Sequence, residues 1–216
     1  MKWLSIIVFV TVTAIHLFAS LKRNKKLRTI TKPFILLSLL LFYISTADKI
    51  SITVVLALLF SWFGDLFLIL AGDKWFVAGG ISFMVSHFFF ALSYLKDINF
   101  DKISPISIAL LALFFIILVS FIFNKLKPHL SKKLFYPMFL YLLINATMNC
   151  FAIFKYICNP SYYHLITAIG AALFFISDTC LFFVRFVENS KLKTHFIIML
   201  TYSLGEFLII LGLILK

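Results

Sequence analysis

The sequence predicts an all-α, polytopic membrane helical bundle of about eight transmembrane helices, with both termini outside. Of its 216 residues, 63% are hydrophobic and 18% are aromatic, more than a soluble domain of this size needs to fill a core. The polar stretches between the apolar segments are short. The chain is therefore interpreted as a single integral membrane domain over residues 1–216, without a soluble appendage.

Eight apolar segments are long enough to cross a hydrocarbon core of about 30 Å, since a helix rises about 1.5 Å per residue. The first ends in the basic run Lys22–Lys26 and lacks a small-residue cleavage site, so we expect a retained helix and not a secretory signal. The predicted helices lie near 3–21, 30–47, 50–71, 75–95, 104–124, 134–156, 161–187 and 194–215.

The formal net charge is +12. The basic residues lie between the apolar segments and form no nucleic-acid-binding surface. The first, fifth and seventh loops are basic, while the loops on the other side hold few lysines, partly offset by aspartates. The positive-inside rule then places both termini outside and the odd-numbered loops in the cytoplasm. We expect the protein to lie in a bacterial cytoplasmic (inner) membrane. Its expected partner is the lipid bilayer, and we expect it to bind no nucleic acid.

Two aspartates lie deep inside apolar segments, Asp65 in LLFSWFGDLFLIL and Asp178 in GAALFFISDTCLFFV. A carboxylate at the centre of a membrane helix costs roughly 2.5–3.5 kcal/mol even on cautious scales. Such residues are therefore candidates for function. The structural alternative is that they bond to backbone or hydroxyl groups of neighbouring helices.

Other polar residues are predicted at similar depths: His87 and Glu206 between the inner leaflet and the midplane, and Asn145 and Asn149 at or just beyond the midplane. We expect one polar cavity, open toward the cytoplasmic leaflet, to collect them with the two aspartates, while the outer half stays almost bare. Each has a structural alternative, because a neutral acid, a core histidine or an asparagine can simply join helices. His16 stands alone on an apolar helix and is assigned no role.

Lys32 and Pro33 are predicted to open the second helix, where a proline is tolerated. Lys32 would then reach the level of the inner headgroups. Taken by itself, it is interpreted as a snorkelling lysine. Catalytic zinc usually takes three protein ligands, whereas only His16 and His87 lie deep and no HExxH occurs. We therefore expect an acid–base site without a metal or other cofactor.

Short motifs spread along the chain carry a family resemblance. They are Lys32-Pro33, Ser61-x-x-Gly64-Asp65-x-x-Leu68, Gly79-x3-Phe83-x3-His87, Tyr141-x6-Met148 and Gly170-Ala171-x-x-Phe174-x-x-Ser177-Asp178. In this order and with this helix count, the chain resembles the YhhN family of integral membrane proteins, whose characterised members are lysoplasmalogenases. It departs from the family at Phe90, where a tyrosine is frequent, and at Glu206, where an amide is expected.

The resemblance implies a hydrolase that cleaves the vinyl ether of a lysophospholipid, such as lysoplasmenylethanolamine or lysoplasmenylcholine, to a fatty aldehyde and a glycerophospho-base. Asp65 and Asp178 would share the roles of general acid and stabilising carboxylate, in an order the sequence leaves open. His87 would orient a carboxyl or the attacking water. The expected substrate-binding residues are Lys32, which would hold the phosphate, with Tyr141, Asn145, Asn149 and Glu206.

Two other classes of protein remain open on the sequence. The acids of a proton- or solute-coupled transporter form a relay, usually with interrupted helices in both halves and polar groups that reach both faces. A lipid-binding or assembly subunit without catalysis needs cations for headgroups but has no clear use for two buried aspartates.

Overall fold

The computed structural model describes residues 2–187 and 195–216, and within them eight helices are long and apolar enough to cross a membrane. This confirms the predicted all-α membrane bundle. The helices are α1 (Lys2–Leu21), α2 (Lys25–Thr46), α3 (Ile52–Ile69), α4 (Asp73–Leu95), α5 (Pro105–Leu126), α6 (Phe135–Cys158), α7 (Tyr162–Phe186) and α8 (His195–Ile214), with short 3-10 turns at Phe100–Lys102, Lys127–His129 and Lys132–Leu134.

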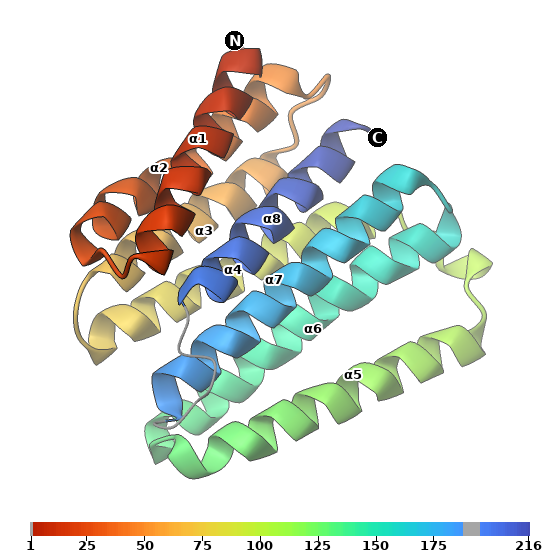
Figure 1. Cartoon of the computed structure of the whole chain (residues 1–216). Helices are drawn as coiled ribbons and strands as arrows, with labels where there is room; N and C mark the ends of the chain where they lie inside the picture. Colours follow the sequence, from red (N-terminus) through yellow and green to blue (C-terminus); the bar gives the residue numbers. More distant parts are fainter. Residues whose placement is uncertain (1, 188–194) are drawn as a thin grey trace.

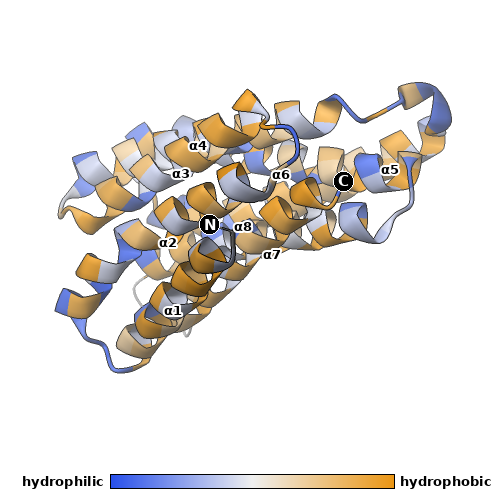
Figure 2. Cartoon of the chain, turned by 90° about the horizontal axis from the view of Figure 1, so that it is seen from above, coloured by the Kyte–Doolittle hydropathy of each residue, from blue (hydrophilic) through white to orange (hydrophobic). Residues whose placement is uncertain are grey.

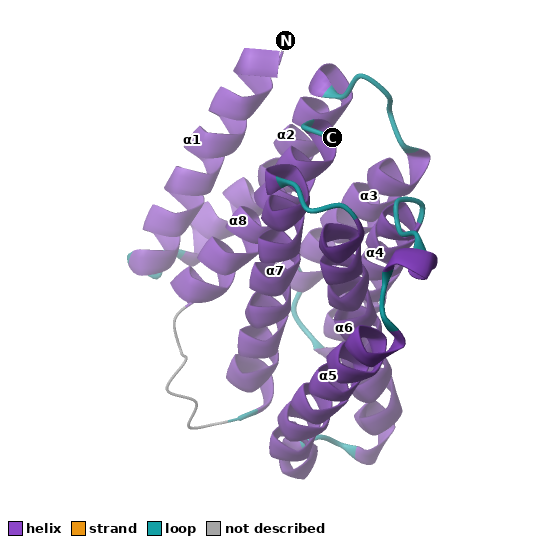
Figure 3. Ribbon diagram, turned by 90° about the vertical axis from the view of Figure 1, so that its right-hand side faces the viewer, coloured by secondary structure: helices purple, strands orange, loops and turns teal. Residues whose placement is uncertain are grey.

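The helices run side by side along one axis, with both termini at one end of the bundle and the α1–α2 connection at the other (Figure 1). Helices pack most closely on their neighbours in sequence within the pairs α1–α2, α3–α4 and α7–α8. Helix α6 contacts both α4 and α7. Helix α5 lies at the edge of the bundle, beside α6 (Figure 3). Which end faces the cytoplasm stays a prediction.

Hydrophobic residues follow the helices, whereas hydrophilic residues gather in connections and helix ends (Figure 2). Many large apolar side chains point outward, such as Ile106 and Leu110 on α5, which are 72% and 62% exposed. In water such a surface would favour aggregation, but in a bilayer it is the surface that contacts lipid.

Helix α2 begins at Lys25, five residues before the predicted start at residue 30. The Asn24 side chain caps the helix by accepting the backbone N–H of Leu27 at 3.1 Å, a start signal that the prediction overlooked. Pro33 therefore lies inside the helix and not in its first turn. Its carbonyl accepts the Trp62 indole N–H at 2.9 Å, which ties α2 to α3. The other helices begin and end close to their predicted limits.

Glycines allow two helix pairs to approach closely. A Cβ at Gly170 on α7 would lie 2.7 Å from the Gly205 carbonyl oxygen of α8, and one at Gly205 would lie 2.9 Å from the Gly170 carbonyl oxygen. On α3, a Cβ at Gly64 would lie 2.7 Å from the Phe83 ring of α4. Small residues at such crossings give membrane helices their packing contacts. Both aspartate-bearing helices are therefore held tightly to the helix that follows them.

The half of the bundle next to the termini, which is the predicted outer half, is not bare, contrary to the prediction. Lys155 on α6 is completely buried, and its Nζ lies 2.9 Å from Asp97 Oδ2 and 5.6 Å from the centre of the Tyr94 ring. Lys216 also contacts Asp97. Burial by itself raises the pKa of the Asp97 carboxyl, but the hydrogen bonds and charges of Lys216 and Lys155 outweigh burial and hold this pKa below its usual value.

This ion pair borders a second cavity of about 460 Å³ at the end of the bundle with the termini, lined by residues that include Ser93, Lys96 and Asp97. Lys155 stands in FAIFKYIC, near the end of α6. The loop-based analysis of charge did not consider it, because it lies inside a predicted helix.

Gly170→Ala should destabilise the protein by about 1–3 kcal/mol, the usual cost of an overpacked core, because the added methyl group meets backbone atoms of α8. Thermal unfolding in detergent measures the effect. Gly80→Ala is the matched control, since a Cβ at Gly80 meets nothing within 4 Å. Equal melting temperatures for the two variants would contradict the close α7–α8 packing.

Asp97→Asn should destabilise the protein near neutral pH, at the lower end of the roughly 3–5 kcal/mol seen when one partner of a buried pair is removed, because Asp97 keeps some contact with water. The lowered pKa of Asp97 means that the carboxylate stabilises the fold above its unfolded-state pKa of about 4, and that this contribution disappears as the pH falls through the folded-state value. The difference in melting temperature between wild type and variant should therefore shrink below about pH 4. A difference that did not change with pH would argue against a charged Asp97.

Candidate active site

A cavity of about 410 Å³ opens at the end of the bundle that carries the α1–α2 connection. Asp65 on α3 and Asp178 on α7 both line it, although they are only 1% and 4% exposed. Its apolar wall includes Leu68, Phe83 and Leu181. Its other polar lining residues are His16, Lys25, Arg28, Thr29, Lys32, Ser177, Arg185, His195 and Tyr202.

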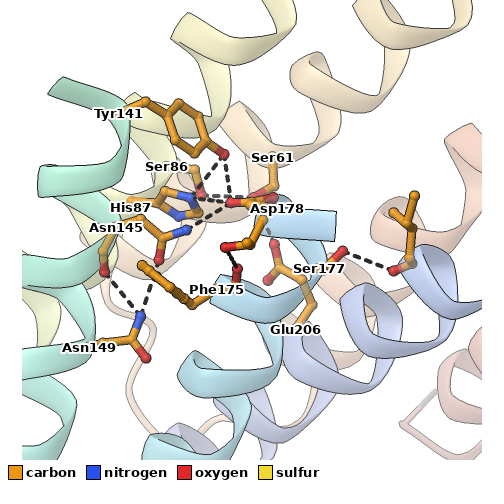
Figure 4. Close-up of polar contacts among 12 residues, drawn as sticks. Ser61, Ser86, His87, Tyr141, Asn145, Asn149, Phe175, Ser177, Asp178 and Glu206 are labelled. Carbon is orange, nitrogen blue, oxygen red and sulfur yellow. Dashed lines mark hydrogen bonds and ion pairs between the residues drawn. The ribbon is translucent and has the colours of Figure 1, made fainter. Parts of the chain in front are cut away.

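Three side chains converge on one oxygen of Asp178. Its Oδ2 accepts the Tyr141 hydroxyl at 2.6 Å and the Asn145 amide at 2.8 Å, and it lies 2.9 Å from His87 Nε2. Figure 4 shows these side chains reaching from α4 and α6 toward Asp178 on α7. All three of these contacts therefore lie on one oxygen of the Asp178 carboxyl group.

The His87 ring is held tightly in place. It is fully buried, and its centre lies 4.6 Å from that of Phe174 and 5.4 Å from that of Tyr141. Because Tyr141 donates to Asp178, the hydrogen on His87 Nε2 is shared between the Asp178 carboxylate and the Tyr141 oxygen at 3.2 Å. His87 Nδ1 is buried and has no partner among the residues that the structure describes. The ring is therefore assigned the tautomer with hydrogen on Nε2.

Asp65 has a different environment. The Lys32 ammonium lies 3.1 Å from its Oδ1, and the Tyr202 hydroxyl donates to its Oδ2 at 3.0 Å. Lys32 thus lies in the cavity wall and pairs with an acid, whereas the sequence predicted it at the level of the lipid headgroups. The reason is the early start of α2, which puts Lys32 two turns inside the helix instead of at its end.

Glu206 lies behind the cavity and not in its wall. It is completely buried, and its Oε1 accepts the Ser61 hydroxyl at 2.7 Å. Ser61 lies 2.7 Å from the Ser86 hydroxyl, so the three residues connect α8, α3 and α4. Glu206 Oε2 has no hydrogen-bond partner within the described part of the chain. An unpaired charge at this depth is costly, which favours a protonated Glu206.

Asn149 also lies away from the cavity. Its amide donates to the Asn145 backbone oxygen at 3.0 Å and to the Asn145 Oδ1 at 3.1 Å (Figure 4). Of the predicted site residues, only Asp65, Asp178 and Lys32 line the cavity. The prediction that one cavity collects all of them is therefore wrong. His87, Tyr141 and Asn145 instead surround Asp178 from behind, with Asn149 one turn further away.

Several cavity residues were not predicted as site residues, chiefly Tyr202, His16 and Arg28. Tyr202 carried a signal, because it precedes Glu206 by four residues and so shares its helix face. No signal in the sequence marked His16 and Arg28, because only the packing of α1 on α2 brings them into the wall of this cavity. In residues 2–187 and 195–216, no group of three or more His, Cys, Asp or Glu side chains is arranged to hold a metal ion.

No curated protein and no solved structure matches this chain. A sequence model of the YhhN family matches residues 27–213, which include almost all of α2 and each later helix that contributes to the cavity. On this match, which covers most of the chain, the protein belongs to the YhhN family.

Proposed function

We propose that this protein is a membrane-embedded hydrolase that cleaves the vinyl ether bond of lysoplasmalogens, releasing a fatty aldehyde and a glycerophospho-base. The observation that carries the proposal is the pair of aspartates in one buried cavity, one surrounded by neutral donors and the other paired with a cation. Membership of the YhhN family supports it. The bacterial cytoplasmic membrane is the proposed location.

In this proposal Asp178 supplies the negative charge. Hydrolysis of an enol ether passes through an oxocarbenium ion, and a carboxylate held in place before the reaction stabilises a cation without reorganisation. Tyr141, Asn145 and His87 bind one oxygen of Asp178. Its other oxygen therefore stays available to the cavity.

The Lys32–Asp65 pair supplies the proton. The pair holds one transferable proton, and it lies at the cavity wall with Tyr202 as a second donor to Asp65. A general acid must reach the atom that it protonates, and both groups of the pair line the cavity. This division of roles assigns the acid to Asp65 with Lys32, and the stabilising anion to Asp178.

The proposed reaction has three steps. The Lys32–Asp65 pair gives its proton to the vinyl carbon distal to the ether oxygen, which leaves an oxocarbenium ion opposite Asp178. Water then adds to the carbon bonded to oxygen and loses a proton to a carboxylate, forming a hemiacetal. The hemiacetal hydroxyl then gives its proton to a carboxylate, the carbon–oxygen bond to glycerol breaks, the glycerol oxygen takes up one proton, and the aldehyde is released. One water is consumed and the catalytic proton is returned.

The first experiment measures aldehyde release from lysoplasmenylethanolamine by the protein purified in detergent. Wild type should form aldehyde, and Asp65→Asn and Asp178→Asn should each lower kcat by about 10²–10⁴-fold, the usual range for a lost acid or base. Asp101→Asn, in an exposed connection, is the matched control and should retain full activity. A parallel reaction with chelator tests whether a metal takes part.

Full activity of Asp65→Asn in a folded sample would refute the assigned acid. A well-folded wild type that releases no aldehyde would refute the proposed hydrolase.

The buried Lys155–Asp97 pair beside the second cavity favours a second candidate function, proton-coupled transport, because polar groups then lie near both ends of the bundle. Protein in liposomes that contain a pH-sensitive dye distinguishes the two. The hydrolase proposal expects proton flux no faster than in protein-free liposomes. Flux that depends on wild-type protein and is lost in Asp97→Asn would favour transport.

A further inference from the structure

The mouth of the cavity that Asp65 and Asp178 line presents cations that have no acidic partner in the described part of the chain. Four basic side chains line this cavity, and two of them are already paired: Lys32 with Asp65 at 3.1 Å and Arg185 with Asp73 at 2.6 Å. Lys25 and Arg28, in the first turn of α2, form no ion pair within the part of the chain that the structure describes. Arg28 is half-buried, and its Nε is enclosed without a hydrogen-bond partner among residues 2–187 and 195–216. Leaving a buried guanidinium N–H without a hydrogen bond costs free energy.

His16 on α1 offers a second unused polar atom in the same wall. It is 1% exposed, and its Nδ1 lies 2.8 Å from the Thr31 hydroxyl. Thr31 donates its own hydrogen to the Leu27 carbonyl at 2.8 Å, so His16 Nδ1 is the donor to Thr31. His16 Nε2 is then an acceptor, and it is buried without a partner among the described residues. The cavity therefore has an anion-binding donor and a neutral acceptor close to its mouth.

These two groups precede the aspartates along the path into the cavity. Arg28 lies one turn before Lys32 on α2, about 6 Å along the helix axis, and His16 contacts Thr31 between them. A ligand that reaches the Lys32–Asp65 pair from the mouth passes Arg28 and then His16. The order of chemical groups that fits is an anion, then a hydroxyl, then the reacting bond.

We infer that Arg28 and His16 form the headgroup subsite for a lysophospholipid: Arg28 binds the phosphate and His16 accepts the free hydroxyl on the neighbouring glycerol carbon. The inference rests on the proposed function, which places the reacting vinyl ether at sn-1 of the glycerol, next to the free hydroxyl at sn-2 and two carbons from the phosphate at sn-3. Lys32, paired with Asp65, is left to the chemistry. A second acyl chain in place of the hydroxyl would leave His16 Nε2 unpaired, which gives the site a reason to select lysolipids over diacyl lipids.

The experiment measures equilibrium binding in nanodiscs of three radiolabelled ligands that lack a vinyl ether. They are 1-acyl lysophosphatidylethanolamine, 1-monoacylglycerol, which has no phosphate, and 2-deoxy lysophosphatidylethanolamine, which has no hydroxyl. Arg28→Gln should weaken binding of the two phosphate ligands by about 10- to 100-fold and leave monoacylglycerol unchanged. His16→Phe should weaken the two hydroxyl ligands by about three- to tenfold and leave the deoxy compound unchanged.

Each variant carries its own folding control, because one ligand should bind as it does to wild type. Lys26→Gln makes the same charge change two residues from Arg28 on α2, outside the cavity lining. His164→Phe removes a buried histidine outside this cavity with the same pattern. Its Nδ1 lies 2.8 Å from the Asn159 carbonyl, and its Nε2 has no partner among the residues that the structure describes. Both should bind all three ligands like wild type. If Arg28→Gln does not fold, Arg28→Lys, which keeps the charge but loses Nε, should show an intermediate loss for the phosphate ligands only.

Two results would overturn the inference. In one, Arg28→Gln and His16→Phe both lose affinity equally for all three ligands; in the other, neither variant loses affinity for any of them. The proposed function fails separately. Wild type that shows the expected ligand selectivity but releases no aldehyde would refute the hydrolase and keep the subsite. Aldehyde release with no selectivity change in the variants would keep the hydrolase and refute the subsite.

Discussion

The burial of two carboxylates between apolar helices is the constraint on which the rest of this structure depends. In a region without water each carboxylate must find donors from other helices. Asp178 obtains them from α4 and α6, and Asp65 obtains them from α2 and α8. The two aspartates therefore connect most of the bundle to α3 and α7, and the cavity lies where these connections meet.

The close packing of α7 on α8 explains how these contacts form. With glycines at the crossing, the α8 backbone lies directly against α7, so one face of α8 is brought beside both aspartates. Tyr202 on that face reaches Asp65, and Glu206, one turn later, reaches Ser61. A protonated Glu206 has one acceptor and one donor, as a glutamine does, which accounts for an acid at a position where the family resemblance implies an amide. Its role in the structure is then to connect α8 with α3 and α4.

Much of the fold follows from sequence alone, because spans of apolar residues separated by basic loops leave few other arrangements in a bilayer. The aspartates were also found, since a carboxylate in such a span is rare. The partners were less predictable. Lys32 meets Asp65 because the Asn24 cap starts α2 early. The rotation of α6 decides that Asn145, and not Asn149, touches Asp178. Lys155 was overlooked because its acid, Asp97, lies beyond the end of another helix.

The two ends of the bundle are separated by a buried layer that bears on the choice between hydrolysis and transport. Along α4, His87 belongs to the inner site and Tyr94 to the outer one, with Phe90 between them. Phe90 and Tyr94 are completely buried, and their rings stack with centres 6.3 Å apart. A phenylalanine at this position, where the resemblance implies a frequent tyrosine, removes a hydroxyl from the layer between the two cavities. Along α4, an apolar side chain therefore lies between the two cavities. This arrangement suits a reaction in a closed-ended site better than passage across the membrane.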